Sequence, residues 1–113
     1  MIVNTPPYGD ERIWNALRLA KALVSVAVGL KINVFLLGDA VSAAKKGQKT
    51  PEGFYNLEKM LRELIERGVV INACGTCISS RGIAESDLVD GVKVGTMIGL
   101  SKWIQASQKV LTF

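Results

Sequence analysis

The 113-residue chain has no histidine, and its only cysteines are Cys74 and Cys77. The lack of histidine removes the usual general base of a cysteine hydrolase, so Cys–His hydrolysis is not expected. A structural zinc ion needs about four ligands, so two subunits would have to share one ion between their cysteines. Two cysteines also do not make the disulfide framework of a small secreted protein. The sequence therefore predicts neither a metal site nor a structural disulfide framework.

Nucleotide and membrane signatures are missing as well. No stretch reads GxxxxGK[ST] or GxGxxG, the fingerprints of phosphate loops and dinucleotide sites, and no cofactor is expected. The longest apolar stretch, residues 20–37, is interrupted by Lys21, Lys31 and Asn33, which predicts a helix end, a turn and a strand. The first residues lack the basic segment and apolar run of a signal peptide. We therefore expect a cytoplasmic protein that does not associate with membranes.

The net charge of +4 is not arranged as in a nucleic-acid-binding protein. Lys45, Lys46 and Lys49 gather around Gly47, while the other basic residues are scattered beside acids on predicted helices. No basic stripe is interleaved with aromatic residues, which make up only 6% of the chain. The lysine cluster is therefore interpreted as a solvated, mobile loop, and no nucleic-acid partner is expected.

What the chain does contain is an alternation of strand-like and helix-like segments. Because 49% of its residues are hydrophobic, it can build a core, and residues 1–113 are predicted to form one domain. The predicted strands are residues 1–5, 31–37, 69–73, 92–94 and 109–113. Apolar residues at helical spacing predict helices that begin at Glu11, at Phe54 and after the capping residue Thr96. This order predicts a three-layer α/β/α sandwich with a mainly parallel sheet of four to five strands.

Both cysteines lie in residues 73–82, ACGTCISSRG, directly after the third predicted strand. In open parallel sheets, ligands bind beyond the carboxyl ends of the strands. Residues 5–10 and 38–40 follow the first two strands and are expected to meet residues 73–82 at that edge. Asp39 in the middle loop suits a turn or helix cap as well as a ligand contact. The cysteine pair therefore lies where this architecture places chemistry.

The residues around the cysteines suit an anionic sulfur. If a helix begins after Cys74, its free N–H groups and the Arg81 guanidinium are expected to lower the pKa of the Cys74 thiol. Gly75 permits a close approach of the backbone. Small hydroxyl side chains follow at Thr76, Ser79 and Ser80. Two other interpretations stay open, because free cysteines often pack as small hydrophobes and because Cys-x-x-Cys can form a redox-active disulfide.

Several runs of the chain follow the order of a known family: PPYGDERIWNALRLAKAL, VFLLGDAV, KKGQKTPEGFYNLEKMLRELIERGVVINACGTCISSRGI and KVLTF. On these runs the chain resembles the DsrE/DsrF-like family, which includes the TusD-type sulfur-relay subunits. The most specific element is a cysteine at the end of the third strand, followed at a fixed distance by Arg81-Gly82. That spacing assigns the family cysteine to Cys74. Cys77 departs from the single-cysteine members and resembles the CxxC variant of others.

The resemblance implies a five-stranded α/β/α domain that assembles into trimers or hexamers, either of one chain or with related subunits. It also implies that Cys74 accepts sulfur as a persulfide or thiosulfonate from one carrier protein and hands it to another, without a cofactor. The candidate catalytic residues are Cys74, Cys77 and Arg81. The candidate substrate-binding residues are Gly75, Thr76 and Gly82.

Three functions compete at this stage. The first is a sulfur-carrier or sulfurtransferase subunit in which Cys74 is the nucleophile. The second is a dithiol redox switch or oxidoreductase that uses a Cys74–Cys77 disulfide, and the third is a non-catalytic assembly subunit in which the cysteines merely pack. Oligomerisation is expected independently, because Trp14, Met97 and Trp103 add to an apolar surface that subunits can bury.

Overall fold

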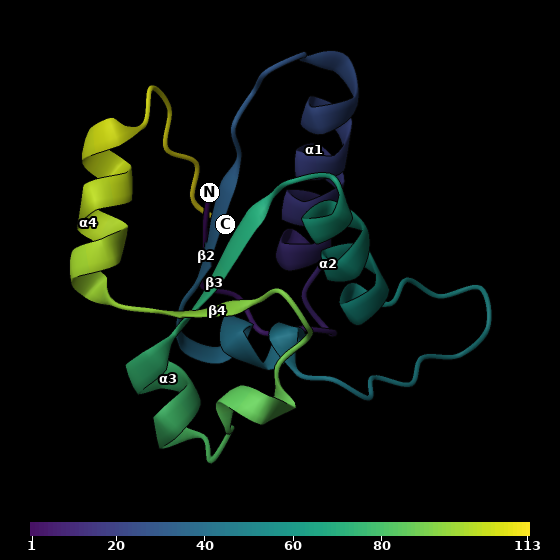
Figure 1. Cartoon of the computed structure of the whole chain (residues 1–113). Coiled ribbons are helices and arrows are strands. Elements are labelled where there is room, and N and C mark those ends of the chain that lie inside the picture. The colour runs from purple at the N-terminus through teal and green to yellow at the C-terminus, as the bar shows by residue number, and fades with distance from the viewer.

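The computed structural model describes residues 1–113, and its centre is a parallel sheet with the strand order β1-β2-β3-β4. The strands are β1 (Ile2–Val3), β2 (Asn33–Leu36), β3 (Val70–Cys74) and β4 (Lys93–Gly95). The predicted last strand is reduced to a parallel bridge between Thr112 and Ile2, at the outer edge of β1. The two termini therefore lie side by side, as Figure 1 shows. The predicted α/β class is confirmed. No strand is longer than the sequence pattern predicted, and some are shorter.

Helices cover both faces of the sheet (Figure 1). Helices α1 (Arg12–Val26) and α2 (Leu57–Glu66) pack side by side on one face, and α4 (Met97–Ala106) lies on the other. At the carboxyl edge lie the 3-10 helix η1 (Gly38–Ala44), the short helix α3 (Gly75–Ser80) and the 3-10 turn η2 (Glu85–Asp87). None of these helices has both the length and the hydropathy that crossing a bilayer requires.

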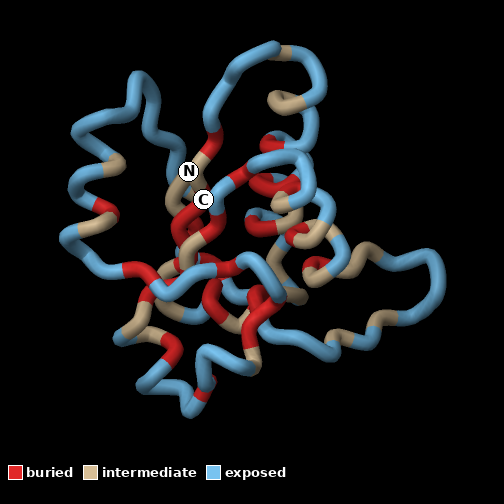
Figure 2. The backbone as a smooth tube through the Cα atoms, viewed as in Figure 1, coloured by how far each residue is buried: buried red, intermediate tan, exposed pale blue.

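The core is thickest between the sheet and the α1–α2 pair. It contains 26 buried residues, seen as the red segments around the sheet in Figure 2. The helical contributions that are fully buried come from one face of each helix: Ile13 and Leu17 on α1, and Leu57, Leu61 and Leu64 on α2. Their spacing of three or four residues is the pattern that predicted these helices.

Helix starts differ in detail from the sequence predictions. The second helix begins at Leu57 instead of Phe54, because the Asn56 side chain caps it by accepting the N–H of Lys59 at 3.1 Å. Phe54 is left outside the helix and is 70% exposed. The predicted cap at Thr96 is confirmed, since its hydroxyl accepts the N–H of Gly99 at 3.0 Å. A favourable cap residue thus decides where each helix begins.

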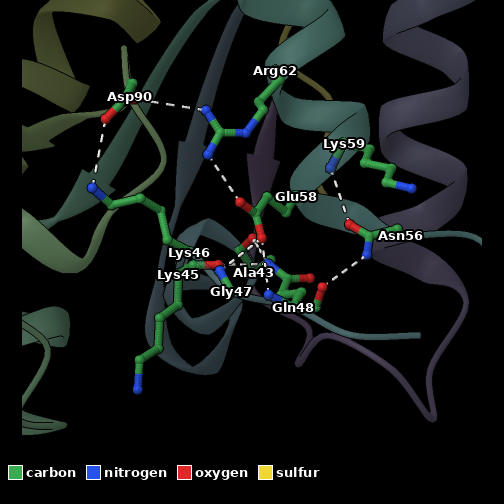
Figure 3. Close-up of polar contacts among 10 residues, drawn as sticks. All are labelled: Ala43, Lys45, Lys46, Gly47, Gln48, Asn56, Glu58, Lys59, Arg62 and Asp90. Atoms are coloured by element: carbon green, nitrogen blue, oxygen red, sulfur yellow. Dashed lines mark hydrogen bonds and ion pairs between the residues drawn. The ribbon is translucent and has the colours of Figure 1, made fainter.

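The polar loop between η1 and α2 is bonded to its surroundings. The Glu58 carboxylate accepts the N–H groups of Gly47 at 2.8 Å and Gln48 at 2.9 Å (Figure 3). It also pairs with Arg62 at 2.9 Å, and this pair, with the N–H groups, holds the pKa of Glu58 below its ordinary value. The lysines of the loop are exposed as expected, but the backbone between them is held and is not free.

The face of the sheet under α4 is thinly covered. Leu100 is the one buried residue of α4, and Trp103 is half-buried, with its ring edge-on to Phe35 at a centroid distance of 5.9 Å. Met97 is 61% exposed and Ile98 is 70% exposed. Ile104 of α4 is also exposed, and so is Val70, which lies on the same face of the sheet as Phe35. The molecule therefore carries an apolar surface over α4 and the adjoining sheet, which we call the α4 surface.

Candidate functional site

Cys74 lies where a strand turns into a helix. It is the last residue of β3, its backbone is in register with Gly95 of β4, and it is the N-cap residue of α3. Its Sγ accepts the N–H of Cys77 at 3.3 Å, so the sulfur takes the place that a capping oxygen usually has. The side chain is buried, with only 6% of the residue exposed. The position at the carboxyl edge agrees with the sequence prediction, but the sulfur points into the protein.

Two glycines allow close packing around β4, Gly75 at the start of α3 and Gly95 against Phe35 of β2. A Cβ atom on Gly75 would come within 3.0 Å of the Val94 side chain, and one on Gly95 would come within 2.6 Å of the Phe35 ring. Gly75 therefore does permit a close approach, and the group that approaches is another strand of the same chain. The same strand runs beside Cys74, whose backbone is in register with Gly95.

Cys77 is placed differently. It is half-buried on the first turn of α3, and its Sγ accepts the N–H of Gly38 at 3.2 Å. Gly38 begins η1, directly after β2, so the contact joins two neighbouring loops at the carboxyl edge. Both cysteines are free thiols.

The sequence analysis expected the Arg81 guanidinium to lie beside the Cys74 sulfur, but its hydrogen bonds go to other groups. Its Nε and Nη2 donate to Oδ1 of Asp39 at 3.0 and 2.8 Å. Its Nη1 donates to the carbonyl oxygen of Cys77 at 3.0 Å and to the Ser80 hydroxyl at 3.2 Å. The guanidinium therefore ties the end of α3 to the Gly38–Asp39 turn and lies on the Cys77 side of the pair.

The pKa of the Cys74 thiol is raised above its ordinary value, so the expected lowering is wrong. Burial is the main cause, and the neighbouring Cys77 thiol adds to it, while backbone N–H groups of the first turn of α3 act in the opposite direction. Two features explain the failed expectation. Arg81 is paired with Asp39, and α3 has only 6 residues, so few peptide dipoles are aligned behind the sulfur.

The remaining predicted site residues have local structural roles or face solvent. Thr76 is exposed on the first turn of α3. Gly82 has a φ of +63°, a left-handed conformation that favours glycine and lets the chain turn away after Arg81. The Arg81-Gly82 spacing therefore has a structural reason, and a substrate contact of Gly75, Thr76 or Gly82 stays a prediction.

Sequence analysis placed Gly38 and Asp39 at this edge but missed the contacts that they make there. Gly38 supplies a backbone N–H to a cysteine sulfur, and Asp39 pairs with Arg81, 42 residues away in the chain. The signal was their position after a parallel strand, which placed residues 38–40 at the right edge without showing which groups meet there.

Other groupings on the surface do not include the cysteines. A hollow of about 390 Å³ lies among aromatic side chains of Tyr8, Phe54 and Tyr55, and one of about 450 Å³ lies among polar side chains that include Gln48 and Lys59. No group of three or more Cys, Asp and Glu side chains is arranged to hold a metal ion. Neither hollow is lined by Cys74 or Cys77.

Comparison with known proteins gives a consistent picture over the whole chain. The family model described as the DsrE/DsrF-like family matches residues 1–113. Protein YchN of Escherichia coli is 43% identical over 113 residues, which are 100% of this chain and 96% of YchN. An uncharacterized protein of Methanocaldococcus jannaschii is 40% identical over the same 113 residues, again 100% of this chain and 96% of that protein.

Solved structures agree with the fold. The crystal structure of YchN from E. coli superposes with a TM-score of 0.93 at 45% identity and covers 99% of this chain and 96% of that chain. A protein of unknown function from Bacteroides thetaiotaomicron has a TM-score of 0.75 at 22% identity, with coverage of 99% and 92%, and shares the fold alone.

Proposed function

The chain belongs to the DsrE/DsrF-like family, and on this premise we propose that it is a sulfur-carrier or sulfurtransferase subunit that relays sulfane sulfur on Cys74. The family is associated with sulfur relay. The observation that carries the proposal is the place of Cys74, at the carboxyl end of an inner strand of a parallel sheet and beside a second free thiol. The sulfur is held as a persulfide or thiosulfonate.

The chemistry needs only sulfur atoms and positioned donors. The Cys74 sulfur, as the thiolate, attacks the outer sulfur of a donor persulfide R–S–SH. A bond forms between Cys74 and the outer sulfur, the bond between the two donor sulfurs breaks, and the donor leaves as a thiolate. The N–H groups of the first turn of α3 lie beside the Cys74 sulfur and can stabilise the charge on the new persulfide. Attack by an acceptor thiolate on the outer sulfur returns Cys74 to a thiol.

The partners that this chemistry requires are other proteins. We propose a sulfur-donor carrier and a sulfur-acceptor carrier, and no role for nucleic acid or a membrane. The α4 surface supports assembly into a homo-oligomer, as a trimer or hexamer, or with related subunits. Two free thiols suit a reducing compartment, and we place the protein in the cytoplasm on that ground.

Intact-mass spectrometry tests the proposal directly. The purified protein is incubated with glutathione persulfide, thiosulfate or tetrathionate and then desalted. With glutathione persulfide or thiosulfate the proposal expects a gain of one sulfur, and with tetrathionate a gain of an S2O3 group. The adduct that survives desalting is expected on Cys74, so it is kept in Cys77→Ser and lost in Cys74→Ser, where Cys77 holds sulfur only transiently. An unchanged mass with every donor would contradict a sulfur-carrier function.

A dithiol redox function is the second candidate, because the two thiols share one turn and the Cys77 N–H lies 3.3 Å from the Cys74 sulfur. Mild oxidation with diamide would then give a reversible loss of two hydrogens and no stable sulfur adduct. A double serine variant that folds, assembles and binds partners like the wild type would instead favour the third candidate, a non-catalytic assembly subunit.

A further inference from the structure

Arg81, which sequence analysis placed beside Cys74, lies instead beside Cys77, and a further donor joins it there. Gly38 donates its N–H to the Cys77 sulfur at 3.2 Å. Arg81 donates to the Cys77 carbonyl at 3.0 Å and to Asp39, the residue after Gly38. The α3 backbone, the η1 turn and an ion pair thus fix the position of Cys77. The Cys74 sulfur is bonded only within its own turn.

Access to the two sulfurs also differs. Exchange between sulfurs requires the attacking thiolate to reach the sulfur under attack, so burial limits its rate. Cys74 is 6% exposed, and β4 runs beside it with Gly95 in register. Cys77 is half-buried at the rim, between α3 and the η1 turn. A donor carried on another protein meets Cys77 first.

We propose that Cys77 is the loading thiol, which takes sulfur from the donor and passes it to Cys74, where the persulfide is kept. This proposal rests on the proposed sulfur-carrier function and assigns a catalytic role to the second cysteine. It also gives the burial of Cys74 a function, because a buried persulfide is shielded from reductants in solution.

The transfer runs in two steps that balance. In the first, the Cys77 thiolate attacks the outer sulfur of R–S–SH, a Cys77–S–SH group forms and R–S⁻ leaves. In the second, the Cys74 sulfur attacks the outer sulfur of that group, the bond between Cys77 and the outer sulfur breaks, and the Cys74 proton passes to Cys77. The products are Cys74–S–SH and Cys77–SH. The sulfane sulfur keeps its oxidation state throughout, so neither step needs an oxidant or a reductant.

The geometry favours the second step. The two cysteines occupy one helical turn, with the Cys77 N–H on the Cys74 sulfur, so the step is intramolecular and has a high effective concentration. The raised pKa of Cys74 makes it a slow nucleophile toward outside donors at neutral pH and leaves a proton to hand back to Cys77. The Gly38 N–H remains in place to stabilise the Cys77 thiolate as it is released.

Time-resolved mapping tests the order of loading. The wild-type protein is mixed with glutathione persulfide, quenched at increasing times with an alkylating reagent and digested with trypsin. Both cysteines fall in the peptide of residues 68–81, and fragmentation between Cys74 and Cys77 locates the added sulfur. The expected result is label on Cys77 first and on Cys74 later. Label that appears first on Cys74 would overturn the proposal, as would release of sulfide with formation of a Cys74–Cys77 disulfide.

A variant gives an independent readout. Cys77→Ser keeps the N–H that caps Cys74, and its loading of Cys74 is expected to be at least about tenfold slower than in the wild type. The exposed Ser86→Ala is the matched control and is expected to load at the wild-type rate. Equal rates of Cys74 loading in Cys77→Ser and in the wild type would contradict the loading role of Cys77 without contradicting the carrier function. A wild type that gains no stable sulfur would instead reject the carrier function itself. If Cys77→Ser fails to fold, the wild-type time course still decides the order.

Discussion

The Arg81 guanidinium pairs with the Asp39 carboxylate at 2.8 Å and also donates to the carbonyl oxygen of Cys77 at 3.0 Å. The two side chains come from elements 42 residues apart and join the end of α3 to the turn after β2. This turn also presents the Gly38 N–H to the Cys77 sulfur. The ion pair thus joins the two elements between which Cys77 and its backbone donor meet.

Breaking this ion pair is expected to cost little stability and to slow sulfur loading. The Arg81 and Asp39 side chains are 32% and 66% exposed, so a double-mutant cycle of Asp39→Asn and Arg81→Gln should give a coupling of only about 0.2–1 kcal/mol in urea unfolding. Both single variants should nevertheless load Cys77 more slowly from glutathione persulfide, because the Gly38 turn is no longer held. Loading at the wild-type rate in both would show that the pair does not position the site.

A Cβ atom at Gly95 is expected to destabilise the fold. In Gly95→Ala it would meet two Phe35 ring atoms at 2.6 and 2.8 Å, and overpacking of this kind costs roughly 1–3 kcal/mol. The Phe35 ring packs edge-on against Trp103, so Trp103 fluorescence should change together with the urea midpoint. Gly75→Ala is the comparison. Its added Cβ would meet the partly exposed Val94 side chain at 3.0 Å, and because that side chain can shift, the loss of stability should be smaller. An unchanged midpoint in Gly95→Ala would show that the sheet accommodates the added methyl group.

The raised pKa of Cys74 predicts a loss of stability at alkaline pH. A thiol with a higher pKa in the folded than in the unfolded state stabilises the fold fully below the unfolded value, and this contribution is lost as pH rises through the folded value. The free energy of unfolding of the wild type should therefore fall more steeply than that of Cys74→Ser as the pH rises above about 8.5, the ordinary pKa of a thiol. Urea titrations at a series of pH values measure this difference. Parallel curves for the two proteins would contradict a raised pKa at Cys74.

The same thiol should be slow to alkylate in the folded protein. Iodoacetamide reacts with the thiolate, and burial limits both the thiolate fraction and the access of the reagent. At neutral pH, Cys74 in Cys77→Ser should react more slowly than the same cysteine in the urea-unfolded chain. Mass spectrometry of the alkylated peptide measures both rates, and equal rates would mean that Cys74 is not protected.

Local patterns were enough to predict the layers of the fold. Apolar spacing along α1 and α2, and the β-branched runs of β2 and β3, are properties of neighbouring residues, so they can be read without tertiary information. The cap at Thr96 was predicted for the same reason. The predicted helix start at Phe54 was wrong because the apolar Phe54 side chain extended the helical spacing, whereas Asn56 caps the helix and makes it begin at Leu57.

The site was predictable in place but not in detail. Its position followed from one rule, that the carboxyl ends of parallel strands meet at one edge. Which partner Arg81 takes depends on competition between the Cys74 sulfur and the Asp39 carboxylate, two groups that only the folded chain brings together. The place of Cys74 beside β4 likewise depends on its pairing with Gly95, a contact between segments about twenty residues apart in sequence.

The α4 surface predicts self-association. Met97 and Ile98 are 61% and 70% exposed and continue onto exposed apolar residues of the sheet, a surface that a stable monomer would rarely present to water. Light scattering at micromolar concentration should therefore report a particle larger than 12.2 kDa. Ile98→Glu places a charge in this surface and should shift the protein toward the monomer, whereas Lys102→Glu on an exposed position of the same helix should not. A monomeric wild type would show that the α4 surface is not covered by a second copy, and an Ile98→Glu variant that stays assembled would place the subunit interface elsewhere.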